Sequence, residues 1–448
     1  MKWTFKRIIS TLLVGFAFLA ISAFWQMYDN KIPLILQYTF GLNETITGFI
    51  MSADNILALF LLPLFGGLSD RCNSKMGRRK PFILVGTVLA VIFMIGLPII
   101  DNLAATNTTI NPLHLLIGFI GVLCLALVSM GIFRSPAVAL MPDVTPKPLR
   151  SVGNSVINLM GAVGGVIFLI VNTIIYSGSN PAEAHVNYLP IFIIVAAIMI
   201  LALLILLFFV NEPKLAAEQA AYEAAHPEEQ LTEMDETKKK AIIPKPVKKS
   251  LIFLLLSVAF WYIGYNAVTT WFSVYATSQW GMTDGGASLC LTIASVGAIA
   301  SYIPAGVLAS FIGRAKTIKI GAAVLAASFG VAFGYTLFAN SFSPALYAVF
   351  ILVGISWAMI NVNSLPMVVE MCSGGDIGKF TGYYYAFSMA AQVITPILAG
   401  TLYGVNPKTL FIYAAIAVLI SFTTMLFVKH GDSKFEAKKG IEAFDIDD

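Results

Sequence analysis

The chain has 448 residues, of which 58% are hydrophobic and only 12% are charged. Soluble proteins carry roughly 25% charged residues, and a chain of this composition cannot bury so much apolar surface in its own core. The composition therefore excludes a soluble globular protein and indicates one that faces lipid. The formal net charge of +4 is small and gives no reason to expect a nucleic-acid partner.

Twelve apolar segments are long enough to cross a bilayer as helices, which takes about 20 residues each. They lie at 9–38, 45–68, 82–101, 112–141, 152–176, 188–210, 250–279, 286–311, 317–338, 344–369, 380–404 and 409–428. The sequence thus predicts an all-α membrane protein with twelve transmembrane helices.

Lysine and arginine residues gather on one side of the predicted membrane. Of the 28 such residues, 25 fall in the termini and in the loops that share their side. Lys408 lies in the opposite loops, while Lys31 and Arg134 fall inside apolar spans. Because positive residues favour the cytoplasmic side, both termini of this multi-pass cell-membrane protein are predicted to be cytoplasmic.

A short basic loop joins the second and third spans and reads GGLSDRCNSKMGRRKP from Gly66 to Pro81. Carriers that alternate between two orientations use such a loop as a charge latch on the cytoplasmic side. We expect Asp70 to bind backbone or arginine groups across the two halves of the protein. The predicted latch residues are Gly67, Asp70, Arg71, Gly77, Arg78 and Arg79.

A polar insert at 211–249 divides the twelve spans into two sets of six, with some helix expected around Leu215–Ala225. The two sets repeat, since Asn30 follows Trp25 at the same spacing as Asn266 follows Trp261. Parallel repeats with a binding site near the membrane midplane are a transporter architecture. The predicted organisation is two six-helix pseudo-repeats at 1–210 and 250–430, joined by a cytoplasmic linker at 211–249 and followed by a tail at 431–448.

Two stretches carry a family resemblance. The first is Ser69-Asp70-Arg71-Cys72 with Gly77-Arg78-Arg79-Lys80-Pro81-Phe82-Ile83, and the second runs from Arg134 to Asp143. Both resemble the major facilitator superfamily, in particular the branch of sucrose–proton symporters and glycoside–pentoside–hexuronide cation symporters. The resemblance implies sugar–proton symport and independently points to Arg134. The plant carriers place a carboxylate in the fourth span, where this chain has Leu123, so the proton acceptor is expected elsewhere.

Ionisable residues inside the predicted spans are candidates for function because charge at membrane depth is costly. They are Asp29, Lys31, Asp54 and Arg134. We expect Asp54 or Asp29 to bind the coupling cation while Arg134 supplies the counter-charge, and the alternative is a fixed salt bridge between helices. Lys31 is expected to reach the outer interface. A proton is favoured over sodium, since a hard cation prefers several oxygen ligands and few carboxylates are present.

Amide and aromatic side chains in the spans suit a neutral, polyhydroxylated substrate. Amides donate and accept hydrogen bonds to hydroxyls, and aromatic rings pack on the C–H face of a pyranose. The alternative is that they serve as interfacial aromatics and interhelical amide bonds. The candidates are Trp25, Gln26, Tyr28, Asn30, Asn55, Asn158, Trp261, Tyr262, Asn266, Trp271, Asn361, Asn363, Tyr384 and Gln392.

The sequence therefore predicts a secondary active transporter, a monomer that imports a sugar such as maltose or sucrose with a proton. Sodium-coupled symport, drug or metabolite efflux and a sensor with a transporter fold remain alternatives. The chain has no nucleophile–base arrangement, metal-ligand spacing or dinucleotide fingerprint, so neither an enzyme nor a bound cofactor or metal is expected. The absence of a GxxxxGK[ST] loop argues against an ATP-driven pump.

Overall fold

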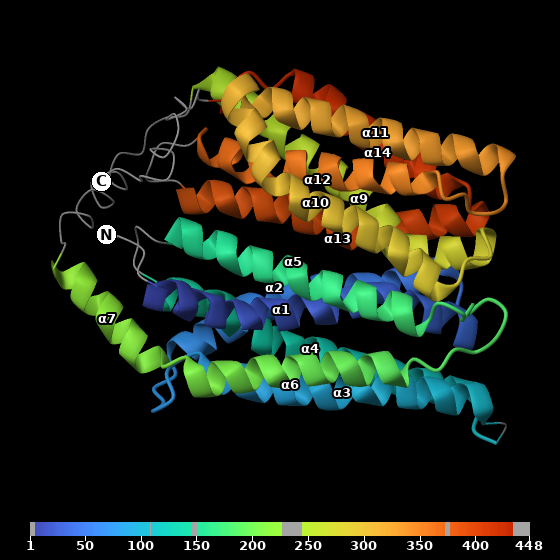
Figure 1. Ribbon diagram of the computed structural model, residues 1–448, viewed down its shortest axis with the longest axis horizontal. Helices are drawn as coiled ribbons and strands as arrows, with labels where there is room; N and C mark the ends of the chain where they lie inside the picture. The colour runs from blue at the N-terminus through green and yellow to red at the C-terminus, as the bar shows by residue number, and fades with distance from the viewer. Residues whose placement is uncertain (1–4, 108, 146–149, 226–243, 372–376, 433–448) are drawn as a thin grey trace. The chain divides into compact units, whose positions relative to one another are not determined.

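The computed structural model describes residues 5–107, 109–145, 150–225, 244–371 and 377–432 (Figure 1). Within these ranges there are no strands, and twelve helices are long and apolar enough to cross a membrane. The predicted all-α membrane fold is confirmed, and each predicted span boundary lies within five residues of the observed helix. The helices are α1 (Phe5–Leu34), α2 (Glu44–Asp70), α3 (Lys80–Thr106), α4 (Pro112–Val144), α5 (Arg150–Ile175), α6 (Leu189–Phe209), α7 (Glu212–Ala225), α9 (Lys245–Gln279), α10 (Asp284–Ile312), α11 (Arg314–Phe338), α12 (Leu346–Val369), α13 (Ile377–Val405) and α14 (Thr409–Leu426), and a π-helix, η1 (Ile35–Thr39), continues α1.

Local sequence signals set the starts of several helices. Asn43 caps α2 by accepting a hydrogen bond from the Ile46 N–H at 2.9 Å. Asn111 caps α4 through the Leu113 N–H, also at 2.9 Å. Pro112 follows in the first turn of α4, where a missing N–H costs no intrahelical hydrogen bond.

The first of two compact units contains Met1–Gln230, Thr269–Thr292 and Pro396–Gly404. Within it α1 packs against α5 and α6, while α3 packs against α4 and α6. Gly164 lets α1 and α5 approach closely, because a side chain there would overlap the backbone of Leu19. The unit thus combines the first six spans with the ends of α9 and α13 and the start of α10.

The second compact unit contains Leu231–Val268, Ile293–Thr395 and Val405–Asp448. In its described part, α11 packs against α12 and α14. Gly354 of α12 lies directly against the backbone of Ala294 in α10. Small residues at such crossings let helices pack closely. This matters in a bilayer, because lipid tails are as apolar as the side chains and the hydrophobic effect does little to drive helices together.

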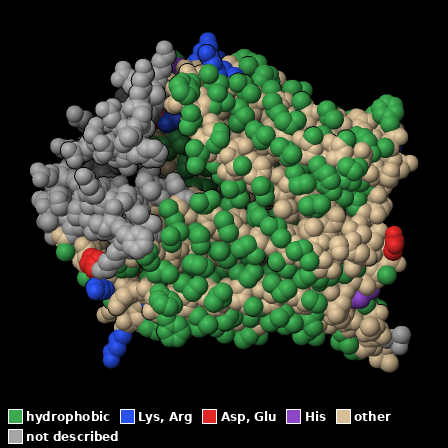
Figure 2. Space-filling view, in the orientation of Figure 1, with side chains coloured by type: hydrophobic (Ala, Val, Ile, Leu, Met, Phe, Trp, Pro, Cys, Tyr) green, Lys and Arg blue, Asp and Glu red, His purple; other side chains and the backbone are tan. Residues whose placement is uncertain are grey.

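Large hydrophobic side chains are exposed along the spans, among them Phe208, Ile303 and Phe338. Figure 2 shows hydrophobic side chains over most of the visible described surface, with charged side chains toward its edges. An apolar surface of this extent is suited to lipid and not to water. The chain is therefore a multi-pass membrane protein.

Candidate functional site

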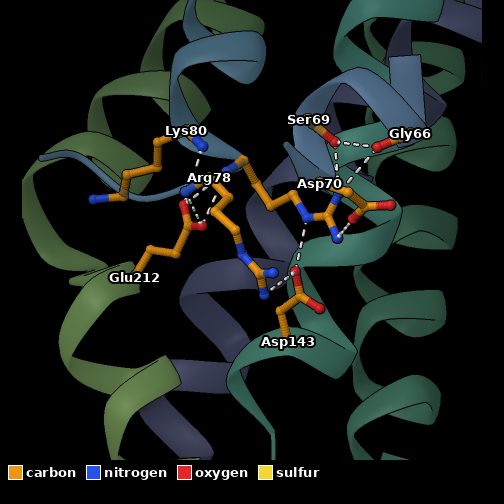
Figure 3. A network of polar contacts seen from close by, with 8 residues as sticks. Gly66, Ser69, Asp70, Arg78, Lys80, Asp143 and Glu212 are labelled. Carbon is orange, nitrogen blue, oxygen red and sulfur yellow. Dashed lines mark hydrogen bonds and ion pairs between the residues drawn. The ribbon is translucent and has the colours of Figure 1, made fainter. Parts of the chain in front are cut away.

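The loop between α2 and α3 carries a network of polar contacts that includes Ser69, Asp70 and Asp143 (Figure 3). The Arg79 guanidinium contacts all three. Its Nε donates to the Asp143 carboxylate at 2.7 Å, and its Nη1 donates to the Ser69 hydroxyl at 2.5 Å. A further nitrogen of the fork pairs with Asp70. The planar guanidinium thus joins the end of α2, the start of α3 and the end of α4. Burial alone would lower the pKa of Arg79, but Asp143 and then Asp70 outweigh it and raise the pKa, so the charge is kept.

The start of α3 binds a carboxylate that the sequence analysis did not select. Glu212, the first residue of α7, accepts hydrogen bonds from the backbone N–H groups of Arg78 at 2.6 Å, Arg79 at 2.9 Å and Lys80 at 3.0 Å. A helix N-terminus favours such an anion. Gly77 has φ +108°, and a Cβ there would overlap the Glu212 carboxylate. The glycine is therefore required by both its backbone conformation and this contact.

The remaining predicted latch residues lie around this network. The Arg78 side chain is half-exposed and lies 3.7 Å from Asp143, while Gly67 and Arg71 are exposed. The partner of Asp70 is Arg79 of the same loop. A contact of Asp70 across the two halves stays a prediction.

A related arrangement occurs in the second unit, where α11 begins. Asp432 accepts hydrogen bonds from the backbone N–H groups of Arg314 at 2.7 Å and Ala315 at 3.3 Å, and the Arg314 side chain pairs with Glu370 at the end of α12. The Asp432 carboxylate thus matches Glu212, and the Arg314–Glu370 pair matches Arg79–Asp143. The repeat seen in the sequence extends to its polar contacts.

Inside the span region of the first unit, the structure brings together several predicted site residues. Asn55 donates to the Asp54 carboxylate at 2.9 Å. The Arg134 guanidinium lies over the Trp25 ring, 5.7 Å from its centre, and its charge acts on Asp54. Asp29 lies within electrostatic reach of Asp54. Two carboxylates and one guanidinium therefore share this region, which we call the carboxylate cluster (Asp29, Asp54 and Arg134).

Other predicted residues of the first unit contact neighbouring groups of the protein or lie exposed. The Tyr28 hydroxyl donates to the Met51 carbonyl at 3.4 Å. Asn30 is buried, donates to the Gln26 carbonyl at 2.8 Å and accepts from Ser273 at 2.9 Å. These contacts favour the interhelical alternative for Asn30. Two further candidates of this unit are Trp271, which is buried and donates to the Pro396 carbonyl at 3.2 Å, and Asn158, which is exposed.

In the second unit, aromatic side chains form a compact group, the aromatic cluster (Tyr262, Tyr265, Trp357 and Tyr384). The Trp357 ring stacks on Tyr265 with centroids 3.8 Å apart and meets Tyr262 edge-on at 5.3 Å. The Tyr384 hydroxyl lies 3.4 Å from that of Tyr262 and 3.0 Å from that of Ser364. The cluster thus presents ring faces together with linked hydroxyl groups.

The remaining predicted residues of the second unit differ in exposure. Trp261 and Asn363 are buried, and Asn363 donates to the Met359 carbonyl at 2.8 Å. Gln392 donates to the Ser388 carbonyl at 3.3 Å. Asn266 and Asn361 are half-buried. Buried amides bonded to their own helix are poor candidates for substrate contacts, and Asn266 and Asn361 are less buried than Asn363.

The expectation that Lys31 reaches the outer interface is wrong. Its side chain is fully buried and pairs with Asp284, the first residue of α10, which is also fully buried. The ion pair satisfies the ammonium group inside the protein, so reaching toward water is unnecessary. The set of ionisable residues in the spans was also incomplete, because Asp101 is fully buried within α3.

Comparisons with known proteins identify the family of this chain. The sequence model of the Major Facilitator Superfamily matches residues 12–288 and 274–444. Proton-associated sugar transporter A of Rattus norvegicus is 31% identical over 172 residues, 37% of this chain and 22% of that protein. Sucrose transport protein SUC3 of Arabidopsis thaliana is 32% identical over 156 residues, 32% of this chain and 25% of that protein. The matched segments thus span about a quarter of these relatives.

The crystal structure of a D-xylose–proton symporter shares the fold. It superposes with a TM-score of 0.68 at 18% identity and covers 95% of this chain and 98% of its own. At this identity the likeness concerns the fold alone. With the sequence model matching almost the whole length, the chain belongs to the Major Facilitator Superfamily, a family of membrane transporters and not of enzymes.

Proposed function

We propose that this protein is a proton-coupled symporter that imports a neutral sugar, such as a disaccharide, by alternating access. The observation that carries the proposal is the carboxylate cluster, in which Arg134 acts on Asp54 in the span region. Ionisable groups are retained at that depth when they serve transport. Relatives whose names refer to proton-associated sugar and sucrose transport give independent support.

The proposed coupling uses the competition between a proton and a guanidinium for one carboxylate. A nearby positive charge favours the ionised carboxylate, while a partly dry surrounding favours the protonated one. A bound sugar that draws Arg134 away from Asp54 would therefore increase the affinity of Asp54 for a proton. Sugar and proton would then cross together, with Asp29 as the second candidate acceptor.

The proposed sugar contacts come from the rings and amides described above. The aromatic cluster offers ring faces and hydroxyls, and Asn361 and Asn266 offer amide groups that donate and accept. Neither substrate charge nor a metal is needed for such contacts. Trp25 beside Arg134 and Asn55 beside Asp54 would place sugar contacts next to the coupling residues.

The proposed orientation places both termini and the α2–α3 loop on the cytoplasmic side of the cell membrane. The Arg79 network would then act as the cytoplasmic latch, and breaking its ion pairs would accompany the change in orientation. Lysine and arginine residues concentrated on that side support this assignment.

The test is uptake into proteoliposomes that contain the purified full-length protein. Labelled maltose, sucrose and melibiose are compared under an inward proton gradient, an inward sodium gradient and no gradient. We expect accumulation of a sugar with the proton gradient, abolished by a protonophore. Accumulation driven by sodium alone would show that sodium is the coupling ion. Extrusion of amphiphilic drugs would indicate an efflux carrier, and binding without transport would favour a sensor.

A further inference from the structure

A buried ion pair lies at the end of the first unit opposite the α2–α3 loop. The Lys31 ammonium pairs with the Asp284 carboxylate, and both side chains are fully buried. The ammonium also lies over the rings of Tyr176 and Tyr188, 5.3 Å and 5.0 Å from their centres. Cation–π contacts of this kind strengthen when water is excluded. The Asn172 amide donates to the other carboxylate oxygen of Asp284 at 3.5 Å.

The ion pair depends on the docking of α10 against the end of α5. The Asp284 N–H donates to the Ser179 carbonyl at 2.8 Å, and the Gly285 N–H donates to the Tyr176 carbonyl at 2.9 Å. Gly285 permits this approach, since a Cβ there would lie 2.5 Å from the Thr173 carbonyl oxygen. If the start of α10 moved away from α5, Asp284 would leave Lys31.

A second carboxylate lies buried at the same end. Asp101 of α3 is fully buried; no described donor lies in good hydrogen-bonding geometry to either carboxylate oxygen, and the nearby polar group that acts on it is the hydroxyl of Thr39 in η1. Tyr188 lies near both acids: burial, then the negative charges of Asp284 and Asp101, raise the pKa of its phenol. The phenol is therefore neutral. We call Lys31, Asp101, Tyr188 and Asp284 the far-end cluster.

Other titratable groups at this end leave the charge balance unchanged. The elements that pack against α3 are α4, α6 and η1. The groups that they and their neighbours contribute here are Tyr38 of η1, Glu44 at the start of α2, Tyr176 at the end of α5, Glu183, His185 and Tyr188 before α6, and His114 of α4; Glu183 and His114 are exposed. Burial lowers the pKa of His185, so it is neutral at neutral pH. Among these described groups Lys31 is the buried cation, and it is already paired with Asp284.

Two buried carboxylates thus lie near Tyr188, whose ring also contacts the buried Lys31 ammonium group. An ionised carboxylate without a cation of its own is very costly in an apolar interior, even beside a single hydroxyl group. Asp101 is therefore protonated while Lys31 is held by Asp284. We propose that the far-end cluster is a second proton-binding site, in which Asp101 releases its proton when α10 undocks and Lys31 becomes the partner of Asp101. This inference rests on the proposed proton-coupled transport and adds a site to it.

The proposed step balances in atoms and charge. The O–H bond of Asp101 breaks and its proton passes to water, while the Lys31 ammonium keeps its protons and moves from one carboxylate to the other. Because undocking releases a proton, a higher pH favours the undocked state. Docking is then stabilised at low pH and weakened as the pH rises.

The docked state can be followed without any sugar. Hydrogen–deuterium exchange of the full-length protein in nanodiscs reports on the amides of Asp284 and Gly285, at pH 6 and pH 8 after correction for intrinsic rates. A single linked proton changes the opening equilibrium by up to about tenfold per pH unit. We expect exchange to rise with pH in the wild type and to stay constant within about twofold in Asp101→Asn. Glu183→Gln, which removes an exposed acid at the same end, should keep the wild-type response.

A second variant keeps the test decisive if Asp101→Asn folds poorly. The double substitution Lys31→Met with Asp284→Leu replaces the ion pair with apolar side chains, which leaves no ammonium for Asp101 to capture. Its exchange should also be independent of pH. A wild-type response that persists in Asp101→Asn or in the double variant, or no response in the wild type, overturns the inference. Because the readout needs no substrate, these results are separate from failure of sugar uptake.

Discussion

Glu212→Gln is predicted to loosen the start of α3. The carboxylate accepts backbone hydrogen bonds from Arg78 at 2.6 Å, from Arg79 at 2.9 Å and 3.2 Å, and from Lys80 at 3.0 Å, through both of its oxygens. Glutamine offers one acceptor oxygen in place of two and carries no charge. At least one of these N–H groups would then face an NH2 group without an acceptor.

The expected cost follows from these contacts. Leaving a buried donor unsatisfied costs about 1–3 kcal/mol, and losing an anion at a helix N-terminus costs about 0.3–2 kcal/mol. Allowing for partial relaxation, local opening of the first turn of α3 should become easier by about 2–4 kcal/mol. Since each 1.4 kcal/mol is a factor of ten, amide exchange over 78–83 should accelerate roughly 30- to 700-fold.

The assay is hydrogen–deuterium exchange of the full-length protein in nanodiscs, read on peptides that cover the start of α3. Glu218→Gln is the matched control, because Glu218 is on the same helix, α7, and is exposed. The control should exchange like the wild type. An acceleration under about threefold in Glu212→Gln, or an equal one in the control, would refute the capping role.

Three further substitutions test the transport cycle in proteoliposomes. Asp54→Asn should abolish proton-driven accumulation while sugar counterflow persists, because the amide cannot take up a proton; accumulation at the wild-type level would exclude Asp54 as the acceptor. Asp70→Asn should slow transport about two- to fivefold, because it removes an exposed charge partner of Arg79, while sugar binding, measured by calorimetry, changes little; equal losses of both would argue against a latch. Arg134→Lys keeps the charge but loses the planar fork, so sugar-induced proton uptake should fall about ten- to a hundredfold at matched protein amounts, and normal proton flux would exclude the proposed role.

The spans could be predicted because the signal is local. A bilayer requires about 20 consecutive apolar residues, and that property can be read from the chain without knowing its contacts. The basic loop could also be predicted from the sequence, since Asp70 and Arg79 lie within one short motif. The role of Glu212 could not be predicted, because it lies in a polar stretch where acids are common. Its capping role depends on the N–H groups at the start of α3, which is distant in the sequence. The signal that could have found it is its position directly after the sixth span.

The carboxylate cluster could be predicted only in part, because the contacts between its members join residues that are distant in the sequence. Asp54 and Arg134 were selected because each is charged within an apolar segment, and the structure brings them into electrostatic reach. Asn30 is a candidate as an amide within a span, at a position that repeats as Asn266, and its bonds to Gln26 and Ser273 favour the interhelical alternative. Repetition at equal spacing identifies equivalent positions, but the contacts of each position differ between the halves.

The Lys31–Asp284 pair shows why charges at the margins of spans are the hardest to interpret. The predicted eighth span began two residues after Asp284, and the predicted third span ended at Asp101, because a charged residue lowers the apolar content by which a span is recognised. The paired residues are 253 positions apart, so no local pattern connects them. Removing one partner of a buried pair typically costs about 3–5 kcal/mol, whereas replacing both with apolar residues is often neutral. If the pair only holds helices together, Lys31→Met with Asp284→Leu should recover the stability and transport that either single substitution loses. If the pair belongs to a proton site, the double variant should recover stability but not the pH dependence of α10 docking.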